Sequence, residues 1–273
     1  MEKKPIVIAI ANQKGGVAKT TTCESLASAL GKSGKNVLVI DMDPQSNISK
    51  HCGLDKSIVA NTPEDFPTMY DVLSPVARPQ IPLSKCVKGA NGFDVAPACT
   101  DMASLEMQFM SQILTSMTHL KEAIQSDAAV QECYDFILID CGPMMNLLIT
   151  NVLVASDYCL IPTQSAVDAV GGILDMYKLV MQVKSGYNPN LTILGIAVTQ
   201  YDGRLIPQRK SREDINTISS QLQIPVIGPE IRQSVAVDKA HHGGETVITF
   251  DPNSTTARDY TALAENIMNA ICK

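Results

Sequence analysis

The stretch from Gln13 to Thr22, QKGGVAKTTT, decides the fold. It follows a short apolar run, Ile6 to Ala11, and leads into a segment of helical spacing that begins at Lys19. A turn between a strand and a helix presents free backbone N–H groups and the positive end of the helix dipole, so it can hold a triphosphate. We therefore expect Lys19 to reach the β- and γ-phosphates, and the Thr20 hydroxyl to ligate Mg²⁺.

The glycines of this loop depart from the standard pattern G-x-x-x-x-G-K-[ST]. Gln13 and Ala18 stand where that pattern has glycine, and the pair Gly15 and Gly16 lies between them. On this template alone, a tight turn without a ligand remains an alternative. If the backbone at position 18 has a positive φ, the methyl group of Ala18 costs on the order of 1 kcal/mol.

Working outward from the loop, short β-branched runs alternate with longer segments of helical period. The expected strands are Ile6–Ala11, Asn36–Ile40, Phe93–Ala96, Phe136–Ile139, Tyr158–Ile161 and Leu191–Val198. The expected helices are Lys19–Ser33, Met102–Ser126, Met145–Ala155, Ala166–Ser185, Arg209–Leu222 and Thr255–Ile271, with loops and short turns over Asn61–Pro97. Strands that are almost wholly apolar indicate a parallel sheet covered by helices on both faces. We predict a doubly wound α/β fold with a mostly parallel sheet, as a single domain over residues 1–273.

Composition excludes several classes of protein. With 273 residues, 45% hydrophobic and 18% charged, the chain can bury a sizeable core, so it is not disordered. A net charge of -6 opposes a uniformly basic protein, so any polyanion must meet a local site. The eight cysteines include no CxxC pair, which favours reduced thiols in a cytoplasm.

No segment has the character of a targeting or membrane sequence. The apolar run Ile6 to Ala11 is too short for a signal peptide. The most apolar stretch, Leu147 to Ile161, is interrupted by Asn151, Ser156 and Asp157, and falls short of the roughly 20 apolar residues of a spanning helix. We expect a cytoplasmic protein.

Acidic residues follow two of the expected strands. Asp41 and Asp43 close the run that begins at Asn36, and Asp140 closes the run that begins at Phe136. A lone aspartate at a strand end is often a turn or a helix cap. However, ligands of doubly wound sheets gather at the carboxyl ends of strands, so three such acids beside a phosphate loop favour a metal and phosphate site.

Taken together, these motifs resemble those of the ParA and MinD ATPases. Their deviant P-loop is xKGGxxK[ST], and Lys14 occupies the position of the signature lysine, which crosses a dimer interface to the partner's nucleotide. The segment Asp41–Asn47, DMDPQSN, resembles their DxDPQ(G/S)N segment. The resemblance implies that Asp43 orients the attacking water and that Asp140 is the Walker B acid, while Asp41 supports the loop or metal-bound water.

The resemblance also implies cofactors and site residues. The cofactors are ATP and Mg²⁺, and the catalytic residues are Lys14, Lys19 and Asp43. Thr20, Asp43 and Asp140 are the metal residues. The expected nucleotide contacts are Lys14, Gly15, Gly16, Val17, Ala18, Lys19, Thr20 and Thr21 in the loop, with Gln200 and Pro229 near the adenine.

A basic segment offers a local site for DNA. Gly203–Arg212 holds Arg204, Arg209, Lys210 and Arg212, and no acid. A solvated helix start is the alternative. The preceding TQYDGR segment resembles the TMYD-x-R segment of ParA proteins, and Arg232 their second arginine, which implies nonspecific binding to duplex DNA. With no Trp and 4% aromatic residues, stacking on single strands is a poor fit.

The function implied is DNA partition. An ATP-bound homodimer would bind nucleoid DNA, and a ParB-like partner bound at a centromere would stimulate hydrolysis and release it. Because few residues precede the first expected strand, we expect no added operator-binding domain. A MinD-like membrane ATPase is one alternative, but the C-terminal segment offers only Arg258 and Lys273 as basic residues.

An iron–sulfur carrier or reductase is the other alternative, and it requires paired cysteines. Cys133, Cys141 and Cys159 lack the spacing of such proteins. The adjacent His241 and His242 have no Cys or acid at ligand spacing, so we expect them to form a turn rather than a metal site.

Overall fold

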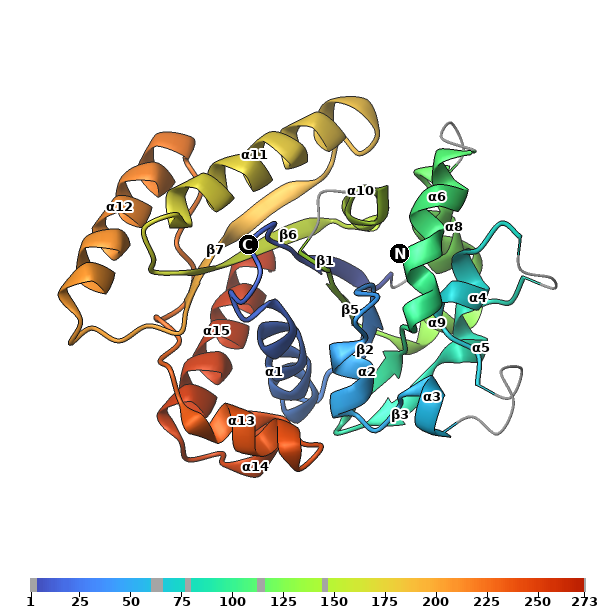
Figure 1. The fold of residues 1–273 in the computed structure, drawn as a ribbon, viewed down its shortest axis with the longest axis horizontal. Helices are drawn as coiled ribbons and strands as arrows, with labels where there is room; N and C mark the ends of the chain where they lie inside the picture. Colours follow the sequence, from blue (N-terminus) through green and yellow to red (C-terminus); the bar gives the residue numbers. More distant parts are fainter. Residues whose placement is uncertain (1–3, 60–65, 77–79, 112–115, 144–146, 273) are drawn as a thin grey trace.

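The computed structural model describes residues 4–59, 66–76, 80–111, 116–143 and 147–272. A seven-stranded sheet runs through it in the order β3-β4-β2-β5-β1-β6-β7 (Figure 1). The strands are β1 (Ile6–Ile10), β2 (Val37–Asp41), β3 (Lys88–Ala90), β4 (Phe93–Ala96), β5 (Phe136–Asp140), β6 (Tyr158–Gln164) and β7 (Thr192–Thr199). All neighbouring strands are parallel except β3 and β4, which are antiparallel. The predicted doubly wound fold is confirmed.

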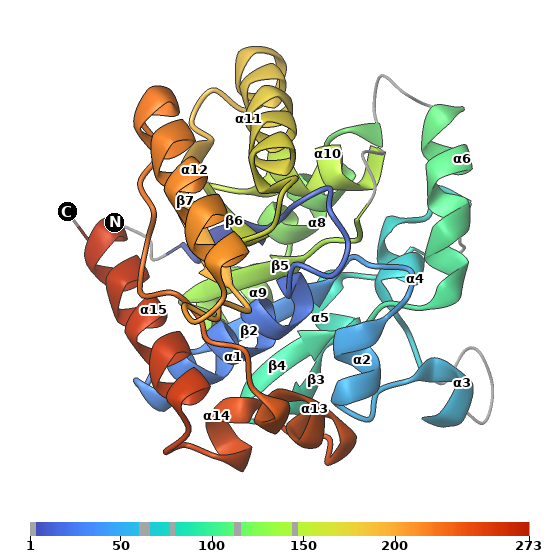
Figure 2. The same ribbon diagram turned by 60° about the vertical axis from the view of Figure 1, so that its left-hand side comes forward.

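The helices of the described residues lie on both faces of this sheet (Figure 2). They are α1 (Lys19–Lys32), α2 (Asn47–His51), α3 (Lys56–Val59), α4 (Met69–Leu73), α5 (Leu83–Cys86), the 3-10 helix η2 (Thr100–Ser104), α6 (Leu105–Met110), α8 (His119–Ser126), α9 (Ala128–Cys133), α10 (Leu147–Ala155), α11 (Ala169–Gly186), α12 (Ile206–Leu222), α13 (Val235–His242), α14 (Val247–Phe250) and α15 (Thr255–Ile271).

Strand β1 shows why its sequence lacks polar alternation. Val7 and Ala9 lie in the core cluster that also holds apolar residues of α10, whereas Ile8 and Ile10 lie in the cluster that holds residues of α1 and α15. Successive side chains point to opposite faces of a strand, and here both faces are covered. The carboxyl ends of β1, β2 and β5 therefore belong to a sheet that is packed against helices on both faces.

Three sequence expectations need correction or fall outside the described residues. The short edge strand β3 was not predicted, because three residues around Gly89 carry no alternating pattern. The single helix expected over Met102–Ser126 is wrong: η2, α6 and α8 divide it, and Met117 and Thr118 form a turn. The start of the helix expected at Met145 lies outside the described residues, and α10 is described from Leu147.

Candidate nucleotide site

The phosphate loop joins β1 to α1 in a backbone conformation that glycine favours. Gly16 has a φ of +74° and Ala18 a φ of 58°, both in the left-handed region. The expected strain at Ala18 is therefore real, because its methyl group makes this conformation costly. Asn12 fixes the loop at its start: its Oδ1 accepts from the Lys14 backbone N–H at 3.0 Å, and its Nδ2 donates to the Pro162 carbonyl at 2.8 Å.

Lys19 is the cation at the centre of the loop. Its side chain is buried, and its Nζ donates to the Lys14 carbonyl at 3.0 Å, so the ammonium curls back over the loop. Burial lowers the pKa of Lys19, and the nearby charge of Asp140 opposes this effect. A desolvated cation whose direct partner is a carbonyl favours the arrival of an anion, as expected for a lysine that binds phosphate.

Asp140, the last residue of β5, has the properties of a cation ligand. Thr20 Oγ1 donates to Asp140 Oδ2 at 2.8 Å, whereas the buried Asp140 Oδ1 has no hydrogen-bond partner among the described residues. Burial, followed by the charge of Asp41, raises the pKa of Asp140 well above its ordinary value. Hard oxygen ligands suit Mg²⁺, so the unpartnered carboxylate oxygen and the Thr20 hydroxyl fit that ion.

Asp41 holds the following loop in place. Its carboxylate accepts hydrogen bonds from the backbone N–H of Ser49 at 3.1 Å, from Ser49 Oγ at 2.7 Å and from the backbone N–H of Asp43 at 3.1 Å. Burial raises the pKa of Asp41 to about 6, against an ordinary value of 3.8. Asp41 thus connects the end of β2 to α2 and fixes the segment that carries Asp43.

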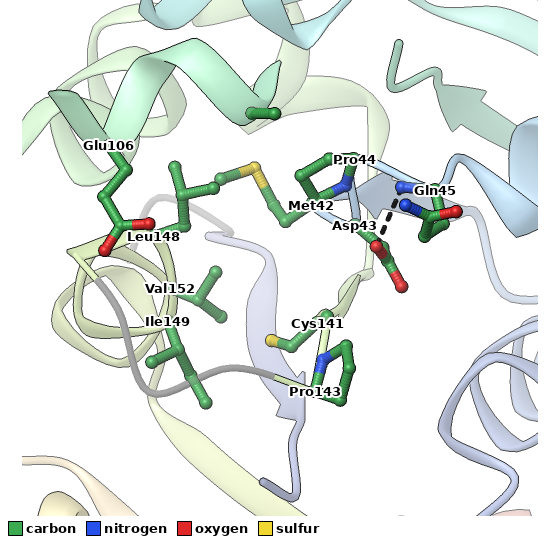
Figure 3. Close-up of a pocket in the computed structure, with 12 residues that line it drawn as sticks. Met42, Asp43, Pro44, Gln45, Glu106, Cys141, Pro143, Leu148, Ile149 and Val152 are labelled. Atoms are coloured by element: carbon green, nitrogen blue, oxygen red, sulfur yellow. Dashed lines mark hydrogen bonds between the residues drawn. The ribbon is translucent and has the colours of Figure 1, made fainter. Parts of the chain in front are cut away.

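Asp43 follows the end of β2, next to the end of β5 that carries Asp140. Its Oδ1 accepts from the Gln45 N–H at 2.9 Å (Figure 3). A Cβ placed on Gly142 would lie 3.3 Å from Asp43 Oδ1 and 3.4 Å from its Cγ. Gly142 therefore leaves the room that Asp43 occupies. The role of Gly142 was not predicted from the sequence, because it depends on the contact between the residues that follow β2 and β5.

A largely apolar cavity of about 240 Å³ adjoins Asp43 (Figure 3). Met42 and Pro44 form one side, and Leu148 and Val152 of α10 form the other. Among the described residues, none of those in the phosphate loop lines it. The cavity therefore lies behind Asp43, separate from the surface where the phosphates are expected.

Lys14 points away from its own loop. It forms an ion pair with Asp168, in the turn that precedes α11. The side chain of Asp168 is 69% exposed and the neighbouring Val167 is 96% exposed, so the pair lies at the protein surface. The two lysines of the loop thus differ in direction: Lys19 is enclosed by the loop, and Lys14 extends to the rim.

The predicted adenine residues lie close to the phosphate loop. Thr199, at the end of β7, donates from Oγ1 to the Val17 carbonyl at 3.0 Å, and Gln200 follows it directly. The Ile231 N–H donates to the Val198 carbonyl at 2.8 Å, which brings the segment after Pro229 alongside β7. The contacts of Gln200 and Pro229 with adenine stay predictions.

The predicted DNA-binding residues divide into two kinds. Arg204 is paired with Asp202 at 2.7 Å, Arg212 with Glu230 at 2.9 Å and Arg232 with Asp259 at 2.6 Å. Arg209 and Lys210 are exposed on α12, and the ion pairs of the described residues include neither. Sequence reasoning missed the acidic partners. Asp202 is visible two residues before Arg204, but the other two acids come from distant segments.

Backbone contacts bring the arginine segments together. The Tyr201 N–H donates to the Ile231 carbonyl at 2.9 Å, and Tyr201 pairs with Arg232 in a parallel bridge. Residues 204–212 and Arg232 therefore lie on neighbouring segments, as the sequence interpretation requires.

None of the helices in the described residues is long and apolar enough to cross a membrane.

Comparison with known proteins identifies the family of the chain. The model of a family described as an AAA domain matches residues 6–193. The chain is 34% identical to the sporulation initiation inhibitor protein Soj of Bacillus subtilis over 261 residues, which cover 96% of this chain and 97% of Soj. It is 31% identical to the chromosome partitioning protein ParA of Caulobacter vibrioides over 273 residues, which cover 98% and 96% of the two chains.

Solved structures share the fold. Cobyrinic acid a,c-diamide synthase from Mycobacterium smegmatis, with bound ADP and magnesium, has a TM-score of 0.79 and 26% identity, covering 98% of this chain and 96% of that one. A plasmid partition protein from Borrelia burgdorferi has a TM-score of 0.76 at 22% identity, covering 98% and 99%. The fold and the site define the chain as a P-loop ATPase. Within that class, it belongs to the ParA/Soj family of partitioning ATPases.

Proposed function

We propose that the chain is a DNA-partition ATPase that binds ATP with Mg²⁺, dimerises in that state, and binds nonspecific duplex DNA as a dimer. The proposal depends above all on the opposite directions of two lysines on one loop: Lys19 is buried over the loop, and Lys14 reaches the surface at Asp168. A lysine that serves only its own nucleotide has no reason to extend to the rim. The cobyrinic acid a,c-diamide synthase structure with bound ADP and magnesium supports the cofactors, and the ParA and Soj relatives support the family role.

The hydrolysis proposal follows from the side chains at the sheet edge. Lys19 neutralises charge on the β- and γ-phosphates, and Asp43 orients the attacking water. Thr20 and Asp140 would hold Mg²⁺, with Asp43 nearby, and the bound ion would neutralise charge on the phosphates. Phosphoryl transfer depends mainly on this positioning and electrostatic stabilisation, and little on a strong base.

Dimerisation would exchange one ionic partner of Lys14 for another. In the single chain Lys14 is paired with Asp168, and both side chains are partly exposed. An exposed pair of this kind is weak because solvent and salt screen it, so a triphosphate on a second copy competes readily for Lys14. The exposed Val167 beside Asp168 would be covered in such a dimer. Hydrolysis would remove the attraction and release the two copies.

The DNA proposal rests on α12 and its neighbours. Arg209 and Lys210 are exposed there, and Arg204, Arg212 and Arg232 lie on adjoining segments with carboxylate partners. Phosphates would compete with those carboxylates for the guanidinium groups. A dimer doubles the number of contacts, so affinity for DNA would depend on ATP. We propose a nucleoid-associated, cytoplasmic protein without stable membrane association, released by a ParB-like partner that stimulates hydrolysis.

The test is DNA binding by the wild type and by Asp43→Ala, each with ATP or ADP, measured by fluorescence anisotropy on a duplex of arbitrary sequence. We expect Asp43→Ala to remain bound with ATP, because its hydrolysis is blocked, and both proteins to lose binding with ADP. Equal binding in both nucleotides would refute the nucleotide switch.

A further inference from the structure

A cluster of three side chains lies apart from the nucleotide site. Glu24 comes from α1, His51 ends α2 and His241 lies in the last turn of α13. The Glu24 carboxylate contacts His51 Nδ1 at 3.1 Å through one oxygen and His241 Nε2 through the other. The expected turn at His241 and His242 is therefore wrong: both residues are helical, and His241 meets residues distant in sequence.

The donor set is that of a metal site. One carboxylate oxygen and two imidazole nitrogens all lie within 4.8 Å of one another. Zinc accepts two histidines and one glutamate, with a fourth position open to water, at Zn–N distances of about 2.0–2.1 Å. Ligands of such an ion are about 3.3 Å apart, so rotation of the imidazoles closes the remaining distance. The rings of His51 and His241 are stacked, with centroids 3.9 Å apart and an interplanar angle of 19°, so at least one ring must turn for both nitrogens to face one ion.

Burial and access also suit a bound cation. The Glu24 side chain is 2% exposed, whereas those of His51 and His241 are 26% and 18% exposed. The anchoring carboxylate is therefore inside the protein, and the two imidazoles leave a path from solvent for an ion and a water ligand. Glu24 uses both of its carboxylate oxygens, one for each imidazole, whereas an ion pair with a single histidine needs only one.

We propose that Glu24, His51 and His241 bind a Zn²⁺-type divalent cation that joins α13 to α1 and α2. The site is independent of the ATP site, which prefers Mg²⁺ and uses hydroxyl and carboxylate oxygens. Because α2 directly follows the loop that carries Asp43, a bound ion would fix the position of that loop's distal end.

The test measures Zn²⁺ binding by calorimetry in protein freed of metal by a chelator. The parent is a Cys133→Ser, Cys272→Ser variant, because both thiols are exposed and thiolates are zinc ligands that would compete with the site. Nucleotide is omitted and Mg²⁺ is kept in excess, so that Zn²⁺ is not bound at the ATP site. His241→Gln should weaken binding at least about 100-fold, since a ligand is lost where even supporting residues cost 10–100-fold. His242→Gln is the matched control and should bind as the parent does.

Co²⁺ gives a second measurement on the same proteins. The parent and His242→Gln should show the intense visible absorption of a low-coordinate Co²⁺ site, and His241→Gln and His51→Gln should not. Circular dichroism verifies that each variant is folded, and His51→Gln replaces His241→Gln if the latter unfolds. If the parent binds Zn²⁺ no more tightly than the folded variants, or if His242→Gln loses as much affinity, the cluster is an ionic contact without metal and the proposal fails.

Discussion

The nucleotide end of the sheet and the proposed DNA surface on α12 hold their charged groups in different ways. At the sheet edge, the titratable groups Lys19, Asp41 and Asp140 are buried, and hydrogen bonds fix them before any ligand arrives. On α12 and its neighbours, guanidinium groups are held by carboxylates that phosphates can replace. The first arrangement stabilises one geometry, as catalysis requires. The second would tolerate many geometries, as the proposed nonspecific DNA binding requires.

Among substitutions that test this comparison, the largest effect on ATP hydrolysis is expected at Lys19. Lys19→Ala should reduce the rate of ATP hydrolysis by about 100- to 1,000-fold, because a preorganised cation at the phosphates is lost. Steady-state phosphate release measures the change. Lys35→Ala, at an exposed position after α1, is the control of equal charge and should keep the wild-type rate. If Lys19→Ala hydrolyses ATP as fast as the Lys35→Ala control, Lys19 does not act on the phosphates.

A smaller effect is expected at Gly142. Gly142→Ala places a methyl group 3.3 Å from Asp43 Oδ1, so Asp43 must shift by a few tenths of an ångström. Since a displacement of about 1 Å can cost about 100-fold, we expect hydrolysis to slow by about tenfold while ATP binding is retained. Gly171→Ala, whose Cβ would meet nothing within 4 Å, should leave the rate unchanged. A normal rate in Gly142→Ala would show that Asp43 need not be held in this position.

Asp41 predicts a pH dependence of stability. Its pKa is about 6 in the folded protein against 3.8 ordinarily, so the folded state binds its proton more tightly than the unfolded state does. Its contribution to stability is then greatest at low pH and is lost as pH rises through 6. Urea unfolding of the wild type relative to Asp41→Asn should show a difference that decreases by about 1 kcal/mol between pH 5 and pH 7. A difference constant with pH would contradict the buried carboxylate.

The smallest effect is expected on α12. Arg209→Ala should lower the salt dependence of DNA binding by about one unit of slope, the contribution of one phosphate contact. Arg212→Ala should lower it by less, because Glu230 already neutralises that guanidinium. Anisotropy titrations across a salt series measure both slopes. Equal slopes for Arg209→Ala and the wild type would remove Arg209 from the DNA surface.

The sequence predicted most of what a single segment determines. The strands of the sheet core and the acids that close β2 and β5 follow from local apolar runs, and the residue type at Ala18 predicts a cost if φ is positive there, as it is in the structure. Contacts between distant segments were not predictable in this way. Gly142 against Asp43, and Arg232 against Asp259, depend on which segments the fold brings together. Local periodicity also failed over Met102–Ser126, where packing divides one apparent helix into several elements.

The most direct test of the central claim is sedimentation velocity of the hydrolysis-blocked Asp43→Ala variant with saturating ATP and Mg²⁺. We predict a dimer with ATP and a monomer with ADP, and we predict a monomer in both nucleotides when Lys14→Ala is added, because no lysine then reaches the partner's triphosphate. Monomers alone with ATP, or dimers that form equally well without Lys14, would contradict the account.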